Sequence, residues 1–89
     1  VKFTPEDNSK DGTAVGYVQR PDRTFRAYIV LASGAPYDLN KCLAHALPHG
    51  KTLICAEQID PRGCITAKLS TSAETDNNKG DIVLLRPVR

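Results

Sequence analysis

Residues 51–71 read KTLICAEQIDPRGCITAKLST, and they contain the clearest β-hairpin pattern in the chain. Two runs rich in β-branched and apolar residues, 51–59 and 64–71, flank the turn sequence DPRG at 60–63. Asp, Pro and Gly in this order favour a type I turn that ends with glycine in the left-handed region. The sequence therefore predicts a hairpin with a bulge at the glycine.

This turn also predicts which residues of the hairpin face each other. Counting back from the turn places Ile59 opposite Ile65 and Cys55 opposite Leu69, all on the buried side. Glu57 then falls on the same side, which is unusual because a charged residue is rarely buried without a partner.

A second hairpin is expected before it, from the strand patterns at 13–19 and 24–32 and the turn sequence RPDR at 20–23. We place Gln19 opposite Thr24, which puts Val18 and Phe25 together on the core face. The other face is then exposed and carries an aromatic and basic set, Tyr17, Arg26 and Tyr28.

The remaining segments are less regular. Residues 1–12 mix proline, glycine and charges, so we expect a loosely ordered arm. Residues 38–47 carry an apolar stripe that favours a short helix, with Asp38 as N-cap and Pro48 as the stop, although an extended segment is the alternative. Residues 82–85 predict a strand that neighbours cover on both faces. The pattern is typical of an all-β sandwich or small barrel.

Length and composition narrow the class of protein. With 89 residues the chain forms a single domain, 1–89. Its formal net charge of +2 is too small to indicate nucleic-acid binding, and no apolar run reaches the roughly 18 residues of a membrane span. The chain contains no methionine, even at position 1, which predicts a processed form such as a secreted protein without its signal peptide.

The pattern of titratable residues does not favour catalysis or a cofactor. Glu6, Asp7, Glu57 and Glu74 are scattered, and no glycine-rich loop precedes a helix. We therefore expect a protein that is not an enzyme and that holds no cofactor.

Three cysteines, Cys42, Cys55 and Cys64, leave three possibilities open. A structural disulfide between Cys42 and Cys55 is favoured, because both fall on apolar sides of their segments while Cys64 points outward. A zinc site formed by Cys42, His45, His49 and Cys55 is the more specific alternative, although Pro48 interrupts the segment that would carry these ligands. Three free thiols are the third.

Several features together resemble the MAX effectors, small secreted fungal proteins related to ToxB. They are the run AYIVLASGAPYDLNKC at 27–42, the twelve residues between Cys42 and Cys55, and the number of extended segments. The resemblance implies a six-stranded antiparallel β-sandwich of two three-stranded sheets with one disulfide, Cys42–Cys55. It also implies that 38–47 is a short strand with loops and not a helix.

The resemblance further implies a secreted fungal effector, or avirulence protein, that is translocated into the host plant cell. Such a protein is expected to be a monomer that binds host plant proteins, namely immune-signalling components or resistance receptors, and so suppresses innate immunity. It is not expected to bind nucleic acid, a membrane or a metal. The segment matching the family's contact strand is 23–32, and its expected partner-binding residues are Arg23, Thr24, Arg26 and Tyr28. The alternative function is a small barrel that binds single-stranded nucleic acid through Tyr17, Arg26 and Tyr28.

Overall fold

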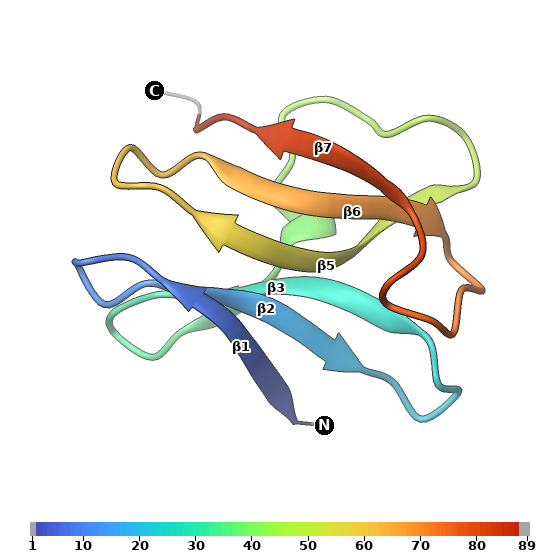
Figure 1. The fold of residues 1–89 in the computed structure, drawn as a ribbon, viewed down its shortest axis with the longest axis horizontal. Coiled ribbons are helices and arrows are strands. Elements are labelled where there is room, and N and C mark those ends of the chain that lie inside the picture. The colour runs from blue at the N-terminus through green and yellow to red at the C-terminus, as the bar shows by residue number, and fades with distance from the viewer. Residues whose placement is uncertain (1, 88–89) are drawn as a thin grey trace.

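A computed structural model describes residues 2–87, which form strands, turns and one short 3₁₀ helix (Figure 1). The strands are β1 (Phe3–Asn8), β2 (Ala14–Gln19), β3 (Phe25–Val30), β4 (Pro36–Asp38), β5 (Lys51–Ile59), β6 (Ile65–Thr71) and β7 (Asp81–Leu85), and the helix is η1 (Leu39–Lys41). The predicted all-β class is confirmed. Within residues 2–87 no helix has the length and apolar character needed to cross a membrane.

The strands form two antiparallel sheets, one ordered β1-β2-β3-β4 and the other β5-β6-β7. The prediction of two antiparallel sheets is confirmed. The prediction of six strands in two three-stranded sheets is wrong, because the first sheet has four strands. The expected loose arm at 1–12 contributes β1, because Phe3 to Asn8 pair with β2. The short strand β4 pairs with β3 and gives the first sheet its fourth member.

The core lies between the sheets and draws on both. A main cluster joins Val15 and Ala27 of the first sheet to residues of the second, Leu53, Ala56, Ile65 and Ala67, with Leu39 of η1 closing one side. A smaller cluster packs Phe25 against Ile54 and Cys55, and Tyr17 lies against it.

The turn of the β5–β6 hairpin has the predicted form. Gly63 has φ +88°, its N–H donates to the Asp60 carbonyl at 3.0 Å, and the Asp60 N–H donates to the Cys64 carbonyl at 3.0 Å. The expected pair of Ile59 with Ile65 is confirmed.

The predicted pairing fails further along β5 because that strand contains two bulges, one between Leu53 and Cys55 and one between Ala56 and Gln58. Each bulge adds a residue to β5 that has no partner on β6. Leu53, not Cys55, therefore faces Leu69. The second bulge releases Glu57 from the core face, and its carboxylate pairs with the Lys68 ammonium at 3.3 Å.

The β2–β3 hairpin is shifted by one residue from the predicted register. Gln19 pairs with Phe25 and not with Thr24, because the turn has the same bulged form as the 60–63 turn. A shift of one residue moves side chains to the opposite face. Tyr17, expected outside, thus points inward and meets the Phe25 ring edge to face at a centroid distance of 5.4 Å.

Segment 38–47 forms neither the locally favoured helix nor a full strand. Asp38 does act as an N-cap, since its carboxylate accepts the Asn40 N–H at 2.9 Å, but η1 ends at Lys41. Tertiary contacts take over the segment: Asp38 pairs with Tyr28 of β3, and the Asn40 side chain bonds to Leu53 of β5. These contacts hold the chain in a short strand and a single turn.

Arg23 is the one described residue other than glycine with a positive φ, +71°. It occupies the turn position that Gly63 fills in the other hairpin, and a side chain there costs about 1 kcal/mol. We expect Arg23→Gly to raise the melting temperature by about 4–8 °C, measured by thermal unfolding. Gly63→Arg is the matched variant and should lower it by a similar amount; equal effects in one direction would contradict the shared turn geometry.

Candidate functional site

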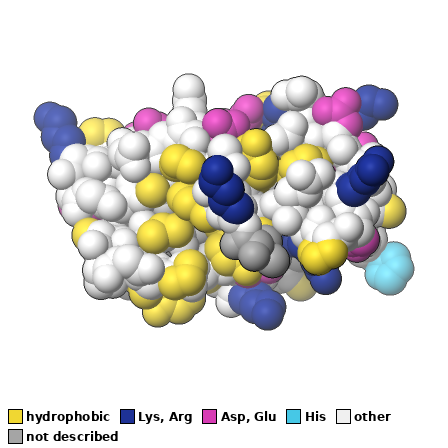
Figure 2. Space-filling model, turned by 90° about the horizontal axis from the view of Figure 1, so that it is seen from below, with side chains coloured by type: hydrophobic (Ala, Val, Ile, Leu, Met, Phe, Trp, Pro, Cys, Tyr) yellow, Lys and Arg dark blue, Asp and Glu magenta, His cyan; other side chains and the backbone are white. Residues whose placement is uncertain are grey.

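A groove of about 730 Å³ lies on the outer face of the four-stranded sheet. It is lined by Phe3, Val18, Arg20, Pro21, Arg26, Tyr28, Pro36, Asp38 and Lys41. Figure 2 views the molecule from the side on which β1 lies, and there hydrophobic side chains adjoin Lys and Arg side chains. The groove combines these two kinds of surface.

The strand register brings the groove residues together in rows. Val18 of β2 lies between Phe3 of β1 and Arg26 of β3, so these three side chains share one face. In the next row Gly16 lies between Pro5 and Tyr28, and its lack of a side chain lets the backbone of Thr4 and Pro5 approach it closely. The floor is therefore apolar, and its polar groups come from Arg26 and Tyr28.

The Arg26 side chain is fixed by the backbone around it. Its Nη1 donates to the carbonyl of Phe25 at 2.6 Å and to the carbonyl of Ser72 at 3.4 Å. Among the described residues these bonds use one of its nitrogens, Nη1, so its other guanidinium N–H groups can donate to an anion.

The groove has a positive charge. Arg20, Arg26 and Lys41 line it, and Asp38 is its only carboxylate among the described residues. Asp38 Oδ1 already accepts the Asn40 N–H at 2.9 Å and the Asn40 Nδ2 at 3.0 Å. The groove thus has three positively charged side chains and one carboxylate, which is already hydrogen-bonded to Asn40. This net positive charge suits a negatively charged partner.

The predicted partner-binding residues divide into two groups. Arg26 and Tyr28 line the groove, whereas Arg23 lies exposed on the adjoining turn. Thr24 is buried, and its N–H and hydroxyl both donate to Asp22 Oδ1. These bonds lower the pKa of the Asp22 carboxyl below its ordinary value, and they give Thr24 a structural role in the turn.

Sequence reasoning missed Phe3, Arg20 and Lys41. Lys41 lies 13 residues beyond Tyr28 in the chain, and only the β3–β4 pairing brings the two to one groove. A strand assignment for residues 3–8 would have indicated Phe3.

No family model, curated protein or solved structure matches the chain. The function assigned to the groove therefore rests on the residues that line it and on the resemblance described above.

The predicted Cys42–Cys55 disulfide is not formed, because all three cysteines are free thiols. Cys55 is 2% exposed and packs against Phe25 and Ile54. Cys42 is exposed at the end of η1, where its Sγ donates to the Asp38 carbonyl at 3.4 Å. The bulge before Cys55 pairs it with Lys68, so the two cysteines occupy different surroundings.

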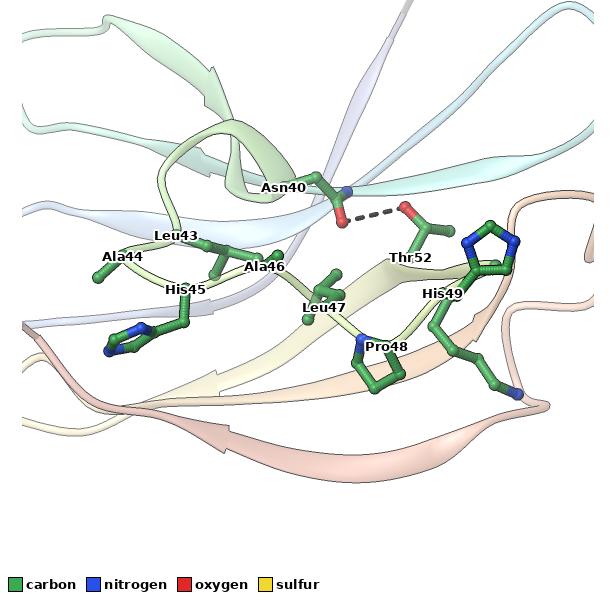
Figure 3. Close-up of a pocket in the computed structure, with 11 residues that line it drawn as sticks. Asn40, Leu43, Ala44, His45, Ala46, Leu47, Pro48, His49 and Thr52 are labelled. Atoms are coloured by element: carbon green, nitrogen blue, oxygen red, sulfur yellow. Dashed lines mark hydrogen bonds between the residues drawn. The ribbon is translucent and has the colours of Figure 1, made fainter.

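The alternative zinc site receives no support either. Among residues 2–87 no group of three His, Cys, Asp or Glu side chains stands close enough to bind a metal ion. Residues 43–52 line a shallow cavity of about 430 Å³ together with Asn40 (Figure 3). In that view His45 and His49 point away from each other.

Burial controls the reactivity of Cys55. Loss of hydration, with smaller contributions from the nearby carboxylates of Glu6 and Glu57, raises the pKa of its thiol to about 12. Since the thiolate is the reactive form, we expect iodoacetamide to modify Cys42 at least about 100-fold faster than Cys55 in the folded protein. Mass spectrometry of peptides after timed labelling measures both rates.

Unfolding in urea supplies the control, because all three cysteines should then react at similar rates. Fast labelling of Cys55 in the folded state would contradict its position in the core.

The same pKa shift makes stability depend on pH. Because the folded protein disfavours the Cys55 thiolate, the contribution of the protonated thiol to the free energy of unfolding is complete below pH 9.0 and is lost as the pH rises towards 12.

Proposed function

We propose that this protein is a secreted fungal effector of the MAX type, which binds a host plant protein without catalysing a reaction and so suppresses innate immunity. In this proposal the groove on the outer face of the four-stranded sheet is the contact surface. A resistance receptor that recognises the effector would contact the same or an adjoining surface.

The observation that carries the proposal is the groove itself. Arg26 and Tyr28, the residues that the resemblance points to, lie in it beside Arg20 and Lys41. Arginine and tyrosine are enriched at protein contact sites because each combines a large buried area with directed hydrogen bonds. The exposed Arg23 supports this use, since the turn keeps an arginine where glycine would be less strained.

Affinity capture from plant leaf extract tests the proposal, with any captured protein then purified for direct titration. We expect Lys41→Glu and Arg20→Glu each to weaken binding by at least about tenfold, because they reverse charges that line the groove. Arg26→Glu should weaken it further, although it also removes the bonds to Phe25 and Ser72.

Lys79→Glu is the matched control, because Lys79 lies in the exposed turn before β7 and outside the groove. Its binding should equal that of the wild type. Equal affinity of all four variants for the partner would show that the groove is not part of the contact surface. A catalytic turnover that one point mutation abolishes would overturn the non-enzymatic part of the proposal.

The structure weakens the alternative that the protein binds single-stranded nucleic acid, because one of the residues expected to contact the bases is not on the exposed face. Tyr17 packs against the core and meets the Phe25 ring edge to face, so only Tyr28 remains of the two tyrosines expected to stack on bases. Binding to a fluorescent single-stranded oligonucleotide that falls steeply with added salt would restore this alternative.

A further inference from the structure

Three of the four sheet edges are protected against pairing with another chain. In β1, Pro5 and a bulge between Pro5 and Asp7 interrupt the edge, and β4 has only three residues. The edge of β5 is covered by side chains: Asn40 bonds to both backbone groups of Leu53, and the Asp7 carboxylate accepts the Ile59 N–H at 2.9 Å. Such features are known ways of preventing edge-to-edge association.

The edge of β7 has none of these features. Its five residues, Asp81–Leu85, contain no proline and no bulge, and they pair with β6 on one side (Figure 1). Within residues 2–87 no other hydrogen bond engages the backbone of 81–85. The strand therefore presents a free row of backbone donors and acceptors.

The side chains of β7 add an exposed apolar surface to this free edge. Val83 and Leu85 pack on the core, whereas Ile82 and Leu84 on the opposite face are 59% and 54% exposed. These are the two most exposed large hydrophobic residues among the described ones. The strand expected to be covered on both faces is thus covered on one.

We propose that β7 is a self-association site, at which a second copy of this chain adds its own β7 antiparallel to the first. A register centred on Val83 places Ile82 opposite Leu84 of the second copy, so the exposed apolar side chains cover one another on both halves of the pair. The contact is separate from the groove and does not depend on the function proposed for it.

The charges that flank β7 select this arrangement. Asp81 begins the strand and Arg86 follows its end. In the antiparallel register Asp81 lies opposite Leu85 of the second copy and one residue from its Arg86, so unlike charges are neighbours at both ends, whereas an in-register parallel pair sets like charges side by side. Two five-residue strands bury less than the roughly 1,200 Å² of a stable interface, so the dimer is weak and forms at high concentration.

Sedimentation equilibrium across a range from about 0.01 to 1 mM tests the association. We expect the mean mass to rise from 9.7 kDa towards twice that value, and amide hydrogens of 81–85 to become more protected at high concentration. Leu84→Lys should remain a monomer. Tyr37→Lys, at an exposed residue of β4, is the matched control and should associate like the wild type.

Charge reversal gives a sharper test that does not depend on loss of an apolar side chain. Asp81→Arg alone and Arg86→Asp alone should each be monomeric, because each brings like charges together. Mixed in equal amounts, the two variants should form a heterodimer, since every end of the strand pair then carries opposite charges. A wild type that stays at 9.7 kDa throughout, or a mixture that stays monomeric, would overturn the proposal.

Discussion

Replacing Asn40 by leucine is expected to lower the free energy of unfolding by about 3–4 kcal/mol, a large part of the roughly 5–10 kcal/mol typical of a small domain. The Asn40 side chain acts as a substitute for a neighbouring strand. Its Oδ1 accepts the Leu53 N–H at 2.7 Å, and its Nδ2 donates to the Leu53 carbonyl at 3.0 Å. Leu53 is 0% exposed, so water cannot readily replace these bonds.

Leucine has a similar volume but no polar atom, so the substitution removes both bonds and leaves two buried backbone groups unpaired. Each unpaired group costs about 1–3 kcal/mol. Urea unfolding followed by circular dichroism measures the change, with the midpoint shifting while the slope stays constant.

Two matched variants separate this cause from others. Thr52→Val removes only the hydroxyl that donates to Asn40 Oδ1 at 3.0 Å (Figure 3), and should cost about 1 kcal/mol. Asn78→Leu, in an exposed turn, should change stability by less than about 0.5 kcal/mol. If Asn40→Leu were as mild as Asn78→Leu, the side chain could not be closing the β5 edge.

Local signals predicted the parts of the fold that depend on turns. The DPRG turn at 60–63 predicted its hairpin and the pair of Ile59 with Ile65, since the glycine marks the bulge position directly. The RPDR turn at 20–23 has the same form, but Arg23 stands where glycine would have marked it. The register was therefore predicted one residue out, and Tyr17 was placed on the wrong face.

Long-range contacts decided what the sequence could not predict. Nothing local to β5 marks its two bulges, which arise where Leu53 to Ala56 must all be buried while Glu57 reaches Lys68. The strand β1 carries proline and charges, and it forms because β2 offers it an edge. Arg26 and Tyr28 were predicted to lie on an exposed face, whereas Lys41 and Phe3 join them in the groove only through the pairing of β4 and β1.

A single methyl group at Gly16 is expected to displace β1 from the sheet. A Cβ at this position would lie 1.9 Å from the Thr4 carbonyl oxygen and 2.9 Å from the Pro5 Cα. Because both contacts are with backbone, no side-chain rotation relieves them. We expect Gly16→Ala to lower the free energy of unfolding by about 3 kcal/mol, although glycine to alanine at a free position usually stabilises by about 0.4–1 kcal/mol.

The location of the damage distinguishes this mechanism from a general loss of stability. Hydrogen exchange should accelerate first in Phe3–Asn8, while the amides of β5 and β6 keep their protection until global unfolding. Gly34→Ala is the matched control, since a Cβ there meets no atom within 4 Å and the variant carries only the strain of φ +92°. It should cost about 1 kcal/mol. Because Phe3 forms one wall of the groove, Gly16→Ala should also weaken any partner bound there, and unchanged protection of β1 would refute the close approach of the two strands.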